Sequence, residues 1–422
     1  MNETVSAGAW RRLNAAIDEV APGPLWDTLS MIRLATHVRM GHDGAAAALA
    51  QLDVKTRLTA LELITTNVPP TPETAKVARD TIFQVEEFKL LSDRAIAVWS
   101  GMSVKDARWS ETNSFDRIRA LGRVVASGVP ADIEGMNALL DQLEHDVEVE
   151  AGVAAWFAER PFDGHAASLA LLARAKRPGA QMEAIGAIIG REDVDAAQAT
   201  SWLDLADAAI AAAPAGNRDA LVGRKAALLS LAGRADEAAA LWPMVLERCK
   251  NVSNTVRHAP VYRALVNAAA VCGYEAWQGV VESVAGARAY LHDPESYHSV
   301  RAACIRSLGR AVRSVDHVDR GNQTFRELTR RIPNGWLTLL HQATVTELAA
   351  RWGRSPEPWW TVLETLLGKK GMPRPGGPIV VEEVVAPLVR VDGPRALALG
   401  DGLPSPLQRA LWAVALITTF AS

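Results

Sequence analysis

Arginine side chains recur at helical spacing in one stretch of the chain. Arg306, Arg310 and Arg313 follow one another at intervals of four and three residues, which would align them on one face of a helix. His317 extends the same series by four residues. A guanidinium binds carboxylates or phosphates through two parallel hydrogen bonds. The pattern predicts a docking strip for an acidic protein or peptide, or alternatively an arginine-rich solvated face that pairs with acidic parts of the same chain.

Two adjacent tryptophans, Trp359 and Trp360, form a second candidate contact. They follow the sequence Ser355-Pro356-Glu357, which is typical of a helix start. A pair of tryptophans at a surface would anchor a partner, whereas core packing is the alternative. The remaining tryptophans, such as Trp202, Trp277 and Trp412, lie within apolar patterns that predict core positions.

No motif in the sequence specifies a reaction. Glu295 and His298 have the E-x-x-H spacing of di-iron bundles, but such a site needs two of these pairs and two further glutamates. Asp141 and His145 belong to an acidic cluster, for which a solvated helix face is the simpler interpretation. The segment Gly368-Lys369-Lys370-Gly371 has the wrong residue order for a phosphate-binding loop. We therefore expect no catalytic motif, cofactor or metal site.

The overall charge argues against a general nucleic-acid-binding protein. The formal net charge is −3 and the calculated pI is about 6.3, whereas nucleic-acid-binding domains are strongly basic. Residues 1–150 hold 15 Lys and Arg against 22 Asp and Glu, so the acidic excess lies in the N-terminal part. Only a local basic face remains compatible with nucleic-acid binding.

The cysteines and the N-terminal sequence suggest a protein of a reducing compartment. Cys249, Cys272 and Cys304 are few, odd in number and far apart, which fits neither a disulfide framework nor a zinc module. Charged residues interrupt the N-terminal segment early, unlike a signal peptide, and the longest apolar run is too short to span a bilayer. We expect a cytoplasmic protein without a membrane segment.

The candidate residues must be positioned by secondary-structure elements, and the sequence shows mainly helical periodicity. Apolar residues recur every three or four positions, and Ser-Pro or Asp-Pro pairs and glycines mark many helix starts and stops. The boundaries predict an all-α chain of about twenty helices joined by short loops, which pack as antiparallel neighbours. Stacked along the chain, such hairpins form an α-solenoid.

One unit resembles a known repeat. Residues 217–250 look like a tetratricopeptide repeat, because Leu231-Ala232-Gly233-Arg234-Ala235-Asp236-Glu237-Ala238 matches the turn between the two helices of that family. Trp242 occupies the position of its large aromatic residue. The match departs at Lys225, where a core leucine is usual, and at Lys250, where the family has a closing proline. The resemblance implies a superhelix of the tetratricopeptide kind, and HEAT-like or irregular repeats are equally compatible with the rest.

The sequence suggests three regions and three functions. The regions are an acidic N-terminal helical part (1–110), a helical-repeat array (111–367) and a Gly/Pro-rich loop followed by C-terminal helices (368–422). Repeat arrays present long grooves to proteins or peptides, so a non-enzymatic interaction scaffold or regulatory adaptor is our first hypothesis. The alternatives are an enzyme with acids and histidines such as His37, His145 or His165 in a helical cavity, and a nucleic-acid-binding array. The sequence leaves the oligomeric state open.

Overall fold

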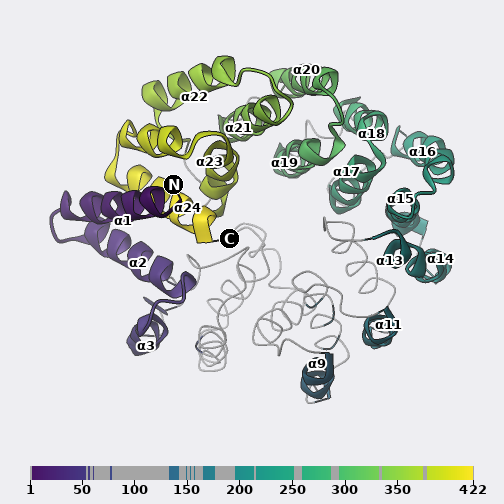
Figure 1. The fold of residues 1–422 in the computed structure, drawn as a ribbon, viewed down its shortest axis with the longest axis horizontal. Coiled ribbons are helices and arrows are strands. Elements are labelled where there is room, and N and C mark those ends of the chain that lie inside the picture. The colour runs from purple at the N-terminus through teal and green to yellow at the C-terminus, as the bar shows by residue number, and fades with distance from the viewer. Residues whose placement is uncertain are drawn as a thin grey trace. The chain divides into compact units, whose positions relative to one another are not determined.

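The computed structural model consists of α-helices joined by short loops (Figure 1). It describes residues 2–53, 56–57, 60, 77, 133–141, 149, 153, 156, 165–175, 195–212, 215–250, 259–286, 294–331, 335–373 and 378–421. No strand occurs among these residues, which confirms the all-α prediction, although they hold fewer than the expected twenty or so helices. None of the helices described combines the length and apolarity needed to cross a bilayer.

The chain forms two compact units. Unit 1 comprises Met1–Arg160, Ala170–Ala175 and Glu364–Ser422, and unit 2 comprises Pro161–Leu169 and Lys176–Leu363. Two helices contribute residues to both units, namely α11 (His165–Ala173) and α22 (Glu357–Lys370).

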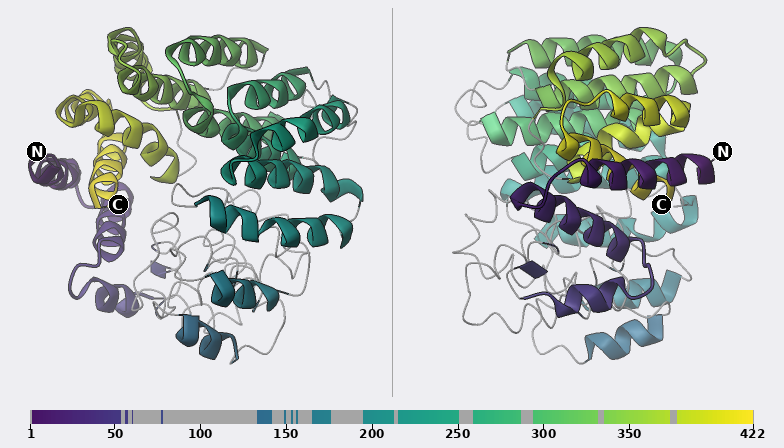
Figure 2. Two further views of the ribbon diagram at one scale, coloured as in Figure 1. Left: turned by 45° about the vertical axis from the view of Figure 1, so that its right-hand side comes forward. Right: turned by 90° about the vertical axis from the view of Figure 1, so that its left-hand side faces the viewer.

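Unit 1 brings together helices from the two ends of the chain. Its other described helices are α1 (Asn2–Asp18), α2 (Pro24–Arg39), α3 (Ala45–Gln51), α9 (Ile133–Leu140), α23 (Pro378–Asp401) and α24 (Pro406–Ala421). Helix α24 packs against α1, α2 and α23, and Figure 2 shows the purple α1 alongside the yellow C-terminal helices. Every residue of α24 from Ala410 to Thr418 is buried.

The C-terminal region is more regular than the sequence suggests. The sequence predicts a Gly/Pro-rich loop before the C-terminal helices, and α23 already begins at Pro378 despite its internal prolines. The helix changes direction at Asp392, whose backbone has φ −154° and ψ 90°. Its carboxylate accepts a 3.0 Å hydrogen bond from the backbone N–H of Arg395, as an N-cap does. Pro394 thus lies in the first turn of a new helical segment, where a proline is tolerated.

Unit 2 consists of helices that pack in two layers. They are α13 (Ala196–Ser201), α14 (Leu203–Ala212), α15 (Ala215–Leu231), α16 (Ala235–Lys250), α17 (Ala259–Cys272), α18 (Tyr274–Gly286), α19 (Pro294–Ala311), α20 (Val315–Arg331) and α21 (Gly335–Arg351). Helices α15, α17, α19 and α21 pack against one another in succession, and α16, α18 and α20 do the same. Figure 1 shows the second set on the outer side of the first.

The tetratricopeptide-like segment forms the expected pair of helices, α15 and α16. The turn between them contains Gly233 in the left-handed conformation, with φ 78°. Its N–H donates to the carbonyl of Ser230, and the N–H of Arg234 donates to the carbonyl of Leu229, which is the Schellman ending of a helix. Gly353 ends α21 in the same way.

Large aromatic side chains fill the cores of both units. Trp202, Trp277 and Trp412 are fully buried, which confirms their predicted core positions. The Nε1–H of Trp412 donates a 2.9 Å hydrogen bond to the carbonyl of Ala396, so its polar edge is satisfied inside unit 1.

Candidate functional site

The first helices of the hairpins in unit 2 expose one narrow face. Helix α17 is covered by α15 and α19 on its sides and by α16 and α18 behind, and α19 is covered in the same way by α17, α21, α18 and α20. The exposed side chains of these two helices are Arg263 and Asn267 on α17 and Arg306 on α19, among those that the structure describes. Because the neighbours cover the other sides, these three residues must lie on the remaining face, which we call the first-helix face.

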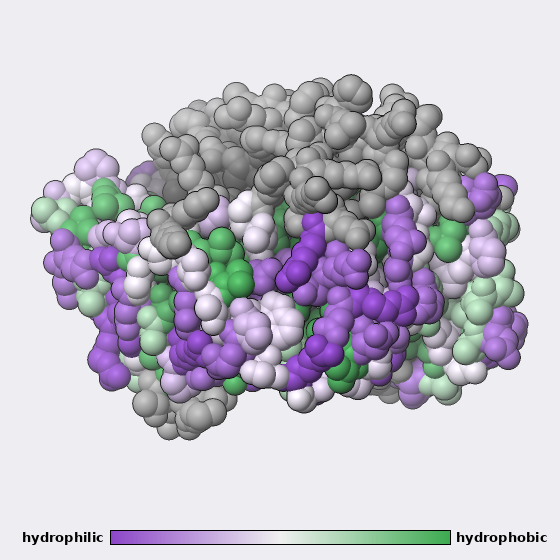
Figure 3. All heavy atoms as spheres, turned by 90° about the horizontal axis from the view of Figure 1, so that it is seen from above, coloured by the Kyte–Doolittle hydropathy of each residue, from purple (hydrophilic) through white to green (hydrophobic). Residues whose placement is uncertain are grey.

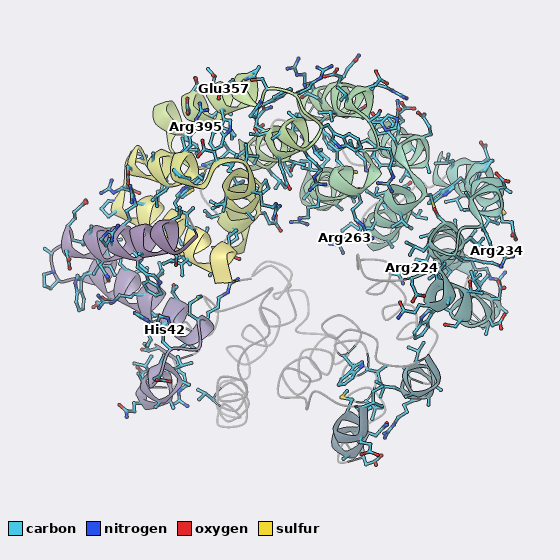
Figure 4. All side chains as sticks on the ribbon, in the orientation of Figure 1. His42, Arg224, Arg234, Arg263, Glu357 and Arg395 are labelled. Carbon is cyan, nitrogen blue, oxygen red and sulfur yellow. The ribbon has the colours of Figure 1, made fainter. Side chains whose placement is uncertain are left out.

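The first-helix face carries positive charge. Helix α17 contains Arg263 and no acidic residue, and Figure 4 shows Arg263 on the side of α17 that points away from α18. On α19, Arg310 lies one turn after Arg306 and is half-buried. Asn267 and Arg306 both stand five residues before the end of their helix. The face therefore carries guanidinium groups from two helices and the amide of Asn267.

The predicted arginine strip is shorter than its spacing indicates. Helix α19 ends at Ala311, so Arg313 lies in the turn that follows and not on the helix face. Its guanidinium donates hydrogen bonds to the carbonyls of Arg310 and Val312, which the end of the helix leaves without helical partners. The prediction of one continuous helical face from Arg306 to His317 is therefore wrong beyond Arg310.

His317 lies in the first turn of α20 and bonds to the segment that connects α19 to α20. Its Nδ1 accepts a 3.1 Å hydrogen bond from the backbone N–H of Arg313. The ring stacks on Tyr274 at a centroid distance of 4.4 Å, and the guanidinium of Arg320 lies 4.8 Å from the centre of the same tyrosine ring. Arg320 also pairs with Glu275 of α18. These contacts join α18 to α20 and give His317 a packing role.

The two neighbouring tryptophans differ in exposure. Trp360 is 1 % exposed and belongs to the core, so it cannot anchor a partner in this conformation. Trp359 is half-buried, and Val362 on the same helix is exposed. Figure 3 shows the surface from the side of α20 and α22, where hydrophilic side chains predominate and apolar ones form small patches. Partner binding at Trp359 remains a prediction.

The residues predicted for acid–base or metal chemistry do not assemble into a site within the described part of the chain. No group of three His, Cys, Asp or Glu side chains able to hold a metal occurs there. Asp141 pairs with Arg174 at 2.6 Å, as a surface carboxylate does. Of the histidines in the enzyme hypothesis, His37 lies in the last turn of α2, within the described residues. The side chains of His145, His165, Glu295 and His298 lie outside the described residues, as do those of the other members of the acidic cluster, Glu144, Asp146, Glu148 and Glu150.

A small pocket lies in unit 1 between α1, α23 and α24. Trp412 lines it with small apolar residues, and its carboxylates are those of Glu19 and Asp401. Both are engaged, Glu19 with Arg409 and Asp401 with Arg12. Since no histidine lines the pocket, it does not supply the acid and histidine pair that the enzyme hypothesis requires.

The sequence patterns did not single out Arg263 and His42 as candidates. Arg263 is a single arginine in an apolar helix, and only its alignment with the arginines of α19 would have drawn attention to it. His42 lies in the loop after α2 (Figure 4), where its ring contacts His37. The helix end at Gly41 could have indicated this contact from the sequence. A Schellman ending places the residue after its glycine beside the residue five positions earlier, which here are His42 and His37.

The comparisons with known proteins add no functional information. The chain matches no protein-family model, and no curated protein or solved structure matches it.

Proposed function

We propose that the chain is a non-enzymatic interaction scaffold whose hairpins form an α-solenoid of the tetratricopeptide or HEAT type. The observation that supports this is the packing order in unit 2, where α15, α17, α19 and α21 contact one another in succession. This succession supports a solenoid, in which each hairpin has the same relation to the next. Such an array uses its first helices to line a groove for a protein or peptide.

We infer that the partner presents an acidic segment to the first-helix face. Arg263, Arg306 and Arg310 contribute positive charge, and Asn267 adds an amide that can donate or accept hydrogen bonds. Arg263 lies on α17 and the other two arginines lie on α19, so an extended segment that crosses from one helix to the next would meet both groups. Ion pairs between guanidinium and carboxylate groups fix the alignment of the two partners and accelerate their association. These ion pairs weaken as the salt concentration increases.

The test is capture of partners by the full chain with its charge reversed at two positions. The variant Arg263→Glu/Arg306→Glu should lose a stoichiometric protein partner that the unchanged chain retains from the lysate of its native host. The same variant should lose binding to a fluorescently labelled poly-glutamate peptide in an anisotropy titration. Both bound species should dissociate at moderate salt, because the contacts are between exposed charges.

A matched control carries the same change in net charge elsewhere. Arg234→Glu/Arg326→Glu alters exposed residues of the turn before α16 and of the second-layer helix α20. It should retain the partner and the peptide, and all variants should melt within a few degrees of the unchanged chain. Equal loss in both variants would mean that net charge alone governs binding. Preferential binding of an oligonucleotide over the peptide would instead favour the nucleic-acid hypothesis.

A further inference from the structure

Two histidines meet at the C-terminal end of α2 in unit 1. The Nδ1 atoms of His37 and His42 lie 2.6 Å apart, and their ring centroids are 4.9 Å apart. His37 is in the last turn of the helix, whereas His42 follows Gly41 in the loop towards α3. The two rings thus present nitrogen atoms to the same point in space.

The backbone fixes this pair. Gly41 has φ 64° and its N–H donates to the carbonyl of Val38, while the N–H of His42 donates a 3.0 Å hydrogen bond to the carbonyl of His37. This Schellman ending places the side chains at its two ends next to each other. The proximity of the histidines is therefore a consequence of the turn, and it does not depend on a flexible loop closing.

An aromatic side chain of α1 supports both rings. Trp10 stacks on His37 at a centroid distance of 4.5 Å and 25°, and on His42 at 5.4 Å and 28°. The indole limits the rotation of both imidazoles, so the two nitrogens are held as a pair. Since His37 is half-buried and His42 is exposed, solvent reaches the pair from one side.

The chemistry of two facing imidazole nitrogens suggests what the pair binds. At 2.6 Å the nitrogens share a proton, since two bare lone pairs would repel each other. A divalent ion bonded at about 2.0–2.1 Å to two imidazole nitrogens in tetrahedral geometry sets them about 3.3 Å apart. A ring movement of about 0.7 Å would therefore convert the hydrogen-bonded pair into a chelate of that geometry.

We infer that His37 and His42 form a binding site for a borderline divalent transition-metal ion, such as Zn²⁺, Ni²⁺ or Cu²⁺. Imidazole nitrogen suits these ions, whereas Mg²⁺ and Ca²⁺ prefer oxygen ligands. No third protein ligand joins the pair among the described residues.

Burial and neighbouring charges act on the imidazole of His37. Partial burial lowers the pKa of His37, and the positive charges of His42 and Arg33 lower it further. A neutral imidazole is the form that binds a metal ion, so these neighbours act in the direction that favours metal binding at His37. Acidification should weaken binding, because protons then compete for the same nitrogen atoms.

The experiment is a calorimetric titration of the full chain, free of any affinity tag, with ZnCl₂ alone at pH 7.5. We expect one saturable equivalent of Zn²⁺ that depends on both histidines. His37→Asn and His42→Asn should each weaken it at least about tenfold, since even the loss of a residue that only orients a ligand costs about 10–100-fold in affinity. Cu²⁺ should bind more tightly than Zn²⁺, and Mg²⁺ should give no heat.

Matched variants keep the result interpretable. His317→Asn removes a half-buried histidine of unit 2 and should leave Zn²⁺ binding unchanged. Trp10→Phe retains both ligands and an aromatic support, so its affinity should stay within a few-fold of the original. Circular dichroism of every variant tests whether the helices remain folded. The inference is overturned by the absence of saturable Zn²⁺ binding, by binding that survives loss of both histidines, or by equal affinity for Mg²⁺.

Discussion

The indole N–H of Trp277 donates a 2.9 Å hydrogen bond to the hydroxyl of Ser307, and both groups are buried. Trp277 belongs to α18 and Ser307 to α19, so the bond joins the second helix of one hairpin to the first helix of the next. The same hydroxyl donates to the carbonyl of Cys304. The serine therefore satisfies a donor in the middle of an otherwise apolar interface.

Replacing this serine should reduce stability. Ser307→Ala leaves the buried indole N–H of Trp277 without its acceptor, which costs about 1–3 kcal/mol. Urea unfolding followed by circular dichroism measures the change in the free energy of unfolding. Ser283→Ala is the matched control, because Ser283 bonds only to the carbonyl of Gly279 in its own helix, and its removal should change stability by less than about 0.5 kcal/mol. Equal losses of stability in the two variants would mean that the hydrogen bond between Trp277 and Ser307 makes no specific contribution.

His341 should make the chain sensitive to acid. It is buried in α21, and burial, aided by the positive charge of Arg326, lowers its pKa from 6.5 to about 3. The unfolded chain takes up a proton near pH 6.5 and the folded chain does not, so the free energy of unfolding should fall below that pH, by at most about 1.4 kcal/mol per unit.

The measurement is urea unfolding between pH 7.5 and 5, compared with the variant His341→Leu. The variant should show a smaller loss of stability on acidification, whatever its stability at pH 7.5. His317→Asn serves as the control at a less buried position and should retain the slope of the unchanged chain. A slope that His341→Leu leaves intact would assign the acid sensitivity to other groups.

Two glycines should respond to alanine with opposite signs. Gly233 adopts φ 78°, where a Cβ is strained, so Gly233→Ala should destabilise the fold by about 1–2 kcal/mol. Gly309 lies within α19, and a Cβ added there meets nothing within 4 Å. Gly309→Ala should stabilise the fold by about 0.4–1 kcal/mol, since it reduces the entropy of the unfolded chain. Thermal melting of the two variants checks both signs.

The ion pairs that join the two ends of the chain should differ in importance. Arg39 of α2 and Glu382 of α23 pair with side-chain exposures of only 6 % and 12 %. Glu382→Gln leaves a buried guanidinium without its counter-charge, for which the expected cost is about 3–5 kcal/mol. The Arg12–Asp401 pair is much more exposed, at 34 % and 52 %, so Asp401→Asn should cost less than about 1 kcal/mol. Urea unfolding of the two variants gives the comparison.

The sequence predicts helices and their ends well because these depend on local chemistry. Ser405 caps α24 through the backbone N–H of Gln408, as its Ser-Pro pair indicates. Gly41, Gly233 and Gly353 end helices where expected, because only glycine adopts a positive φ without strain. The hairpin of α15 and α16 follows from such signals, whereas its membership of a repeat family stays a prediction.

The candidate sites were less predictable because they depend on contacts between distant residues. The arginine spacing is periodic through Arg313, but the helix ends at Ala311 and the last arginine bonds to its carbonyls. Trp359 and Trp360 are adjacent in sequence, so they project in different directions and only one is fully buried. Arg263 is a candidate because α17 packs against α19, and no local sequence pattern predicts that packing.

The packing of α1 against the C-terminal helices α23 and α24 has a consequence for how the chain folds during synthesis. Arg12 and Asp401, which pair in unit 1, are separated by 389 residues. At about 5–20 residues per second, a ribosome needs roughly 20–80 s between the two segments. During that interval the apolar residues of α1, such as Leu13, lack the helices that later bury them. Unit 1 therefore completes its core late, and its N-terminal helices are the segment that a chaperone would have to protect from aggregation.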